Sequence, residues 1–260
     1  MDALLYMIHG MWGTPWYWDN YRRAFEAEGL SCVTPTLRHH DMDALGEPPP
    51  GLGTTSLLDY AADLQGEVGA LACAPIIIGH SMGGLLAQVL ASRGLARAAV
   101  LLTPAAPSGI LALTPSVIRS FGSVLSRWGF WRKPMRPTYR EAAYSLLHLV
   151  PQQERSGVYD RFVYESGRAA AELGFWAFDR HRAAHVEEAQ VTCPLLIIGA
   201  GQDRITPASV VRRVAAKYRR VSTYVEFPDH AHWVVGEPGW EKIVACVLRW
   251  MRENGLNRRA

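Results

Sequence analysis

The chain of 260 residues has little excess charge and no long apolar run. Basic residues outnumber acidic ones by 27 to 24, so composition alone gives no reason to expect a nucleic-acid partner. No apolar stretch approaches the roughly 20 residues of a membrane-spanning helix. The first residues also lack the basic region and the small-residue cleavage site of a secretory leader. We therefore expect a soluble, cytoplasmic protein.

Cysteine is scarce, and its spacing excludes common zinc and redox motifs. No two of the four cysteines form C-x-x-C, and each lies in an apolar stretch: Cys32, Cys73, Cys193 and Cys246. We expect buried free thiols, which fit a reducing compartment. The run His39-His40-Asp41 and the pair His181 and His185 lack the further ligands that a zinc site would need. No metal and no organic cofactor is expected.

Short apolar runs alternate with longer amphipathic ones along most of the chain. The apolar runs predict buried strands at residues 4–8, 31–34, 76–78, 98–102, 195–198 and 223–227. Between them, the patterns predict helices at residues 18–29, 57–72, 82–92, 210–218 and 239–252. Strands that are apolar throughout and alternate with helices indicate an α/β fold, with a mostly parallel sheet and helices on both faces.

The segment 114–188 breaks this alternation. It has no run that predicts a strand, and it is rich in arginine, aromatic residues and helix formers. We expect it to form a helical cap, inserted into a core that residues 1–113 and 189–260 build together.

One motif carries nucleophilic chemistry. The run Gly79-His80-Ser81-Met82-Gly83-Gly84 matches G-x-S-x-G, directly after an apolar strand and directly before a helix. In that context the serine lies on a sharp, strained turn, and only small residues fit two positions away on either side. The turn lifts the hydroxyl to a helix N-terminus, where developing negative charge is favoured. Ser81 is the predicted nucleophile.

A serine hydroxyl needs a general base and a group that orients the base. Asp203 and His232 follow Ser81 in the order Ser, Asp, His, each in a loop just after a predicted strand. His230 competes with His232 for the role of base, and we favour His232 because it lies further from the strand, immediately before an apolar run. Asp229 is too close to the histidine in sequence to orient it comfortably.

A transition state with a negatively charged oxygen needs two aimed N–H donors. The expected donors are the backbone amides of Met82, the residue after the nucleophile, and of Met11, in the glycine-containing loop after the first strand. Nearby Trp12, Trp16 and Trp18 either line an apolar acyl pocket or belong to the core; Trp12 is the candidate substrate-binding residue.

Four motifs together resemble the α/β-hydrolase fold superfamily, over residues 4 to about 250. They are His9-Gly10-Met11-Trp12, the run from Gly79 to Gly84, Gly201-Gln202-Asp203-Arg204-Ile205-Thr206-Pro207 and His230-Ala231-His232-Trp233. The resemblance is nearest to serine carboxylesterases and the lysophospholipase and monoacylglycerol-lipase-like branch. Two features depart from it: the chain starts almost on its first parallel strand, and residues 35–41 lack the Asp-x-Arg-Gly-x-Gly run of many relatives.

The resemblance implies hydrolysis of a small ester through an acyl-enzyme, and the aromatic residues of the segment 114–188 suggest an apolar acyl or aryl group. The same three residues also serve thioesterases, acyltransferases and carbon–carbon bond hydrolases, and some members with this fold are ligand receptors. Residues 119–140 hold six basic residues, no acidic one and several aromatic ones. This pattern predicts either a solvated cap surface or a weak contact with a membrane surface or an anionic substrate.

Overall fold

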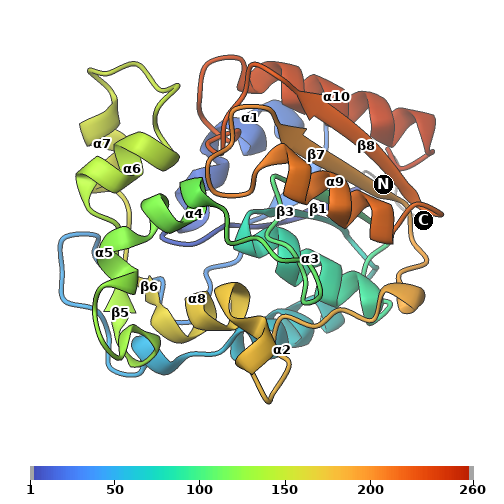
Figure 1. The fold of residues 1–260 in the computed structure, drawn as a ribbon. Coiled ribbons are helices and arrows are strands. Elements are labelled where there is room, and N and C mark those ends of the chain that lie inside the picture. The colour runs from blue at the N-terminus through green and yellow to red at the C-terminus, as the bar shows by residue number, and fades with distance from the viewer. Residues whose placement is uncertain (1–2, 258–260) are drawn as a thin grey trace.

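The computed structural model describes residues 3–257, which form a six-stranded sheet and its flanking helices (Figure 1). The strand order is β2-β1-β3-β4-β7-β8, and every pairing in this sheet is parallel. The strands are β1 (Leu4–Ile8), β2 (Ser31–Val33), β3 (Ile76–His80), β4 (Ala98–Leu102), β7 (Leu195–Ala200) and β8 (Ser222–Phe227). The central strands β3, β4 and β7 are buried along their whole length, which explains their uninterrupted apolar runs.

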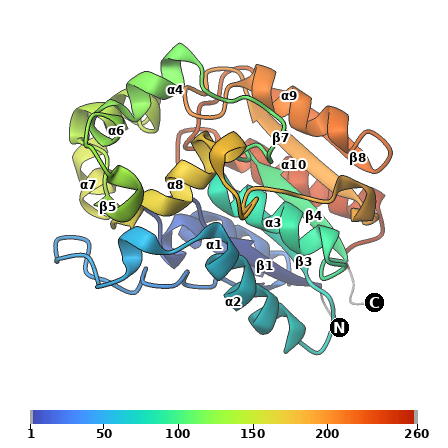
Figure 2. The same cartoon turned by 60° about the horizontal axis from the view of Figure 1, so that its bottom comes forward.

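Helices cover both faces of the sheet (Figures 1 and 2). The helices α1 (Asp19–Ala27) and α10 (Trp240–Glu253) contact each other on one face. The other face carries α2 (Leu57–Gly69), α3 (Met82–Ser92) and α9 (Ala208–Lys217), of which α2 and α3 are in contact. The fold class predicted from the sequence is confirmed.

Local chemistry sets where several helices begin and end. Pro15 starts a 3-10 turn, η1 (Pro15–Trp18), so α1 begins one residue later than the sequence pattern predicts. Gly29, with a φ of 80°, allows the chain to reverse after α1. Ser56 caps α2 and forms a reciprocal capping box with Asp59. A second 3-10 turn, η2 (Leu52–Thr54), closes the irregular stretch before α2.

The four cysteines are free, as predicted, but their expected burial is only partly correct. Cys246 is buried, whereas Cys32, Cys73 and Cys193 are half-buried. These three lie at a sheet edge or in a loop, where an apolar local sequence does not bring full coverage. Among residues 3–257 no helix is long and apolar enough to cross a membrane.

Between β4 and β7 the chain leaves the sheet and forms a separate group of short elements, drawn green to yellow in Figure 1. They are α4 (Pro115–Ser120), α5 (Gly122–Leu125), η3 (Phe130–Arg132), β5 (Pro134–Met135), α6 (Tyr139–Ser145), α7 (Arg155–Asp160), β6 (Glu165–Ser166), α8 (Gly167–Gly174), η4 (Trp176–Phe178) and η5 (Glu188–Gln190). We call residues 114–188 the cap segment. The prediction that it contains no strand is wrong, because β5 and β6 pair antiparallel. Strands of two residues are too short to leave a periodic pattern in the sequence.

A buried carboxylate on the cap segment binds three groups, two of them from the residues before α3. Glu165 Oε2 lies 3.2 Å from His40 Nε2, and Tyr60 donates its hydroxyl to Glu165 Oε1 at 2.7 Å. The Ser166 amide donates to the same Oε1 at 2.6 Å. Neither the His40 nor the Glu165 side chain is exposed to solvent. We call this group the Glu165 cluster.

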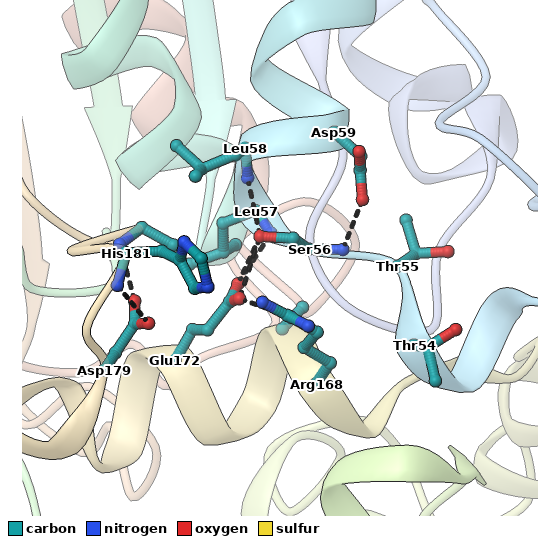
Figure 3. Close-up of polar contacts among 12 residues, drawn as sticks. Thr54, Thr55, Ser56, Leu57, Leu58, Asp59, Arg168, Glu172, Asp179 and His181 are labelled. Atoms are coloured by element: carbon teal, nitrogen blue, oxygen red, sulfur yellow. Dashed lines mark hydrogen bonds and ion pairs between the residues drawn. The ribbon is translucent and has the colours of Figure 1, made fainter.

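A second buried carboxylate of the cap segment binds the N-terminus of α2 (Figure 3). Glu172 on α8 accepts hydrogen bonds from the Ser56 hydroxyl, at 2.8 Å, and from the Leu57 amide, also at 2.8 Å. Arg168, one turn earlier on α8, donates to the same carboxylate at 2.8 Å. A carboxylate is stabilised there because the first amides of a helix are unpaired and the helix dipole is positive at that end.

Candidate active site

Ser81 lies on a tight turn between β3 and α3. Its φ of 55° and ψ of −119° are strained for a residue with a side chain, as the sequence motif predicts. The flanking glycines are required by space: a Cβ on Gly79 would lie 2.2 Å from the carbonyl oxygen of Gly83. A Cβ on Gly83 would lie 2.2 Å from the carbonyl oxygen of Ile8. The turn therefore holds Ser81 against the end of β1.

The structure brings Ser81, His232 and Asp203 into one chain of hydrogen bonds. His232 Nε2 lies 2.9 Å from Ser81 Oγ, and His232 Nδ1 lies 2.8 Å from Asp203 Oδ2. Since a carboxylate only accepts, Nδ1 carries the proton and Nε2 presents its lone pair to the serine hydroxyl. An imidazole placed in this way is able to take the hydroxyl proton when Oγ attacks an electrophile.

Asp203 is buried and fully supplied with donors. Its Oδ1 accepts from the amides of Ile205, at 2.7 Å, and Thr206, at 2.8 Å, and its Oδ2 accepts from the Thr206 hydroxyl at 2.8 Å. Burial acts to raise the pKa of Asp203, but the neighbouring His232 and these hydrogen bonds outweigh it and hold the pKa below its usual value. The carboxylate thus remains charged and able to stabilise an imidazolium.

The competing histidine has a different partner. His230 Nδ1 lies 2.9 Å from Glu237 Oε1, a buried carboxylate that also accepts from the Ala231 amide at 2.7 Å. The structure therefore places His232, and not His230, next to Ser81.

The backbone amides of Met11 and Met82 are both available. Within residues 3–257, neither donates a hydrogen bond to a protein group. Both residues line the same cavity as Ser81. Gly10 permits the close approach of the Met11 loop, because a Cβ there would lie 2.9 Å from the Ser81 Cβ. Two unpaired amides beside a nucleophile form a place where an oxyanion can be held.

The cavity at Ser81 has a volume of about 100 Å³. Apart from the serine and Thr206, its side chains are apolar, and the cap segment supplies most of them: Val117, Phe121, Val124, Leu125, Phe130, Ala170, Leu173 and Phe175. We call it the inner cavity. It suits an apolar group joined to a carbonyl.

Trp12 is not among the residues that line the inner cavity. Its ring packs on Phe121 with the ring centroids 5.5 Å apart, and Phe121 does line the cavity. The backbone at Trp12 has a φ of 62°, and its carbonyl accepts from the Val163 amide of the cap segment at 3.0 Å. Of the two alternatives left by the sequence, the structure favours a core position that supports the cavity.

Two residues around the hydrogen-bond chain were missed from sequence. His80 donates from Nε2 to the carbonyl oxygen of His232 at 2.8 Å, and burial lowers its pKa to about 3, so it stays neutral. The Thr206 hydroxyl lies 3.3 Å from His232 Nδ1 as well as bonding Asp203. Both residues belong to motifs that were recognised in the sequence. His232, which both of them contact, comes from a distant loop, so the contacts could not be predicted. Among residues 3–257 no group of three or more His, Cys, Asp or Glu side chains could hold a metal ion.

Solved structures with similar folds cover nearly all of the chain. A methylesterase from Arabidopsis has a TM-score of 0.70 at 12% identity, covering 96% of this chain and 99% of its own. A monoacylglycerol lipase from Paleococcus ferrophilus has a TM-score of 0.66 at 21% identity, covering 95% and 93%. A thermophilic esterase from Thermogutta terrifontis has a TM-score of 0.68 at 20% identity, covering 97% and 92%.

At these identities the structural likeness establishes the fold alone. No curated protein matches the sequence. Residues 5–243 match the family model described as the alpha/beta hydrolase family. This match spans most of the chain and confirms the resemblance that the four motifs indicate. The chain belongs to the alpha/beta hydrolase family.

Proposed function

We propose that the protein hydrolyses carboxylic esters, with Ser81 as nucleophile, His232 as general base and Asp203 as the group that orients and stabilises His232. The single observation that carries this proposal is the unbroken chain from Asp203 Oδ2 to His232 to Ser81 Oγ, with both links below 3 Å. The proposal is supported by geometry, because the three residues come from three separate loops and their side chains still lie within hydrogen-bond distance of one another.

The reaction divides into two halves. Ser81 Oγ attacks the ester carbonyl while its proton passes to His232 Nε2, and the amides of Met11 and Met82 bind the oxyanion. The carbon–oxygen bond to the alcohol then breaks, and the alcohol leaves with the proton from His232. In the second half, water gives a proton to His232 and attacks the acyl carbon, the acid leaves, and the proton returns to Ser81.

The apolar lining of the inner cavity favours an ester with an apolar acyl group. Thioester hydrolysis, acyl transfer and carbon–carbon bond hydrolysis use the same residues and are the alternatives. A receptor without turnover is less well supported, because no group in the described part of the chain accepts a hydrogen bond from the Met11 and Met82 amides, which lie next to the Ser81–His232 hydrogen bond.

The exposed part of the cap segment favours a weak contact with an anionic lipid surface. Trp128 and Phe178 are each 86% exposed, and Trp131 is 38% exposed. Arg127 and Arg132 are exposed and adjoin Trp128 and Trp131 in sequence. Aromatic rings enter the interface of a membrane, and each nearby basic residue adds about 1 kcal/mol of attraction to anionic lipid. We propose that an anionic lipid surface is the partner of the cap segment.

The test of ester hydrolysis starts with a fluorophosphonate probe, which labels an activated serine. We expect labelling of the wild type and of Ser92→Ala, a control serine at the far end of α3, and no labelling of Ser81→Ala. A panel of p-nitrophenyl esters then measures turnover. Labelling that persists in Ser81→Ala, or no turnover of any ester, would refute the proposal.

A further inference from the structure

Two hollows meet at a pair of phenylalanine rings. One is the inner cavity at Ser81. The other has a volume of about 570 Å³ and is lined by the cap segment and Thr54, including Trp131, Arg168, Glu172 and Phe178. We call it the outer groove. Phe130 and Phe175 line both hollows, so their rings separate the two.

The two rings come from different elements that are held together closely. Their centroids lie 6.2 Å apart. Phe130 begins η3, and a Cβ on Gly167 at the start of α8 would lie 1.9 Å from the Phe130 carbonyl oxygen. Since no side chain fits at Gly167, η3 and α8 touch backbone to backbone. Phe175 directly follows α8, so the two rings are carried by elements that pack against each other.

The size of the inner cavity sets a limit on what fits in front of these rings. A cavity of about 150 Å³ holds one benzene molecule, so the inner cavity, at about 100 Å³, has room for about four carbon atoms. An ester carbonyl placed at Ser81 would therefore bring the end of a short acyl chain against Phe130 and Phe175.

The outer groove is suited to an apolar chain beyond the rings. Four of its lining residues are aromatic, namely Phe130, Trp131, Phe175 and Phe178. The groove also has four charged lining residues, Arg132, Arg168, Glu172 and Asp179. Arg168 and Glu172 bond each other at 2.8 Å, Glu172 also binds Ser56, and Asp179 accepts from two backbone amides of its own loop. The carboxylates of the groove already have hydrogen-bond partners within the protein. A hydrocarbon chain that passes the aromatic rings would therefore not displace those partners.

We infer that Phe130 and Phe175 form a wall that restricts the enzyme to esters of short acyl chains, and that opening this wall joins the inner cavity to the outer groove. The inference rests on the proposed function and names its substrate class. Phe175 is the part of the wall that can be altered, since it is 36% exposed, whereas Phe130 is 9% exposed and packs on α8.

The experiment measures kcat/KM for p-nitrophenyl esters from acetyl to decanoyl. In the wild type we expect a maximum at or below about four acyl carbons and a steep fall beyond it. In Phe175→Ala we expect the maximum to move to longer chains, with a gain of up to about fourfold for each methylene newly buried. Phe175→Trp should shorten the accepted chain.

Tyr139→Ala is the matched control, because Tyr139 is an aromatic residue of the cap segment that lines neither hollow and is 43% exposed. It should leave the position of the maximum unchanged. Phe175→Leu is a milder change that repeats the test if the alanine variant folds poorly, and fluorophosphonate labelling reports a folded site in each variant.

Two results would refute the inference that Phe130 and Phe175 limit the length of the acyl chain. One is a Phe175→Ala profile that equals the wild-type profile while short esters are still hydrolysed. The other comes from a second panel, acetyl esters of alcohols of increasing length: a range that broadens in Phe175→Ala for these esters alone would assign the groove to the alcohol. Absence of turnover in every variant, including the wild type, would instead contradict the proposed ester hydrolysis.

Discussion

Replacement of Glu165 by alanine is expected to destabilise the protein strongly and to loosen the cap segment. The alanine would remove the acceptor of three buried groups at once: His40 Nε2, the Tyr60 hydroxyl and the Ser166 amide. These groups are shielded from water, so none of them regains a solvent partner without local opening.

The expected loss of stability follows from the burial of His40 and Glu165. A stranded buried donor costs about 1–3 kcal/mol, and breaking a buried ion pair by removing one partner costs about 3–5 kcal/mol. We take about 4 kcal/mol as the loss in free energy of unfolding. In a domain of this size each kcal/mol lowers the Tm by about 2–4 °C, so a decrease of roughly 8–16 °C is expected.

The variant Glu165→Gln separates the charge from the hydrogen bonds. An amide oxygen still accepts from Tyr60 and from the Ser166 amide, but the negative charge opposite His40 is lost. Burial acts to lower the pKa of His40, yet the charge and hydrogen bond of Glu165 outweigh it, helped by the Arg38 carbonyl and by Asp41, and raise the pKa above its ordinary value. His9 faces His40 with the ring centroids 5.2 Å apart, and burial lowers the pKa of His9 to about 3, so it adds no charge.

The direction of the pH dependence follows from the raised pKa. The folded state holds the His40 proton more tightly than the unfolded state, so the contribution to stability is complete below the ordinary histidine pKa of about 6.5. It is lost as the pH rises through the raised folded-state pKa. The wild type should therefore lose stability across this window relative to Glu165→Gln, whose His40 lacks the counter-charge.

Urea denaturation followed by circular dichroism, at pH values from 6 to 9, measures both effects. The control is Glu187→Gln, which removes the partner of His185 in a pair 3.8 Å apart whose side chains are 60% and 34% exposed. It should change stability by less than about 0.5 kcal/mol. The reasoning is refuted if Glu165→Ala costs no more than this control, or if Glu165→Gln keeps the wild-type pH dependence.

Three further predictions concern the site and the cap surface. Asp203→Asn should lower kcat by about 10⁴, because the amide stabilises the wrong imidazole tautomer, while KM changes little in steady-state assays. His232→Gln should abolish fluorophosphonate labelling, and His230→Gln should retain it while lowering the Tm; the opposite pattern would reverse the assignment of the base. Trp128→Ala should weaken co-sedimentation with vesicles containing anionic lipid without changing hydrolysis of a soluble ester. Equal binding to neutral vesicles would count against the lipid contact.

Much of the fold and the reacting residues could be predicted because they depend on local sequence. The strand β1 and the helix α3 have the bounds that their patterns predict, whereas β3 runs two residues further than predicted, through Gly79 to His80. The carboxyl ends of parallel strands meet at one edge of the sheet, so Asp203 and His232 could be placed near each other from their strands alone.

The Glu165 cluster and the phenylalanine wall could not be predicted in this way. His40 and Glu165 are separated by 125 residues, and both lie in stretches without a periodic pattern. The cap segment is built from helices of eight residues or fewer and from two-residue strands, which leave no hydrophobic period long enough to orient a side chain. Which residues line a cavity there depends on tertiary packing.

The helix α8 joins the two parts of the structure that the sequence leaves unassigned. Its Glu172 is bound to the N-terminus of α2, a core helix, and its last residue immediately precedes Phe175 in the wall. About one turn of helix separates the anchor from the ring. A change at Glu172 is therefore expected to disturb both the contact of the cap segment with the core and the position of Phe175 in the proposed wall.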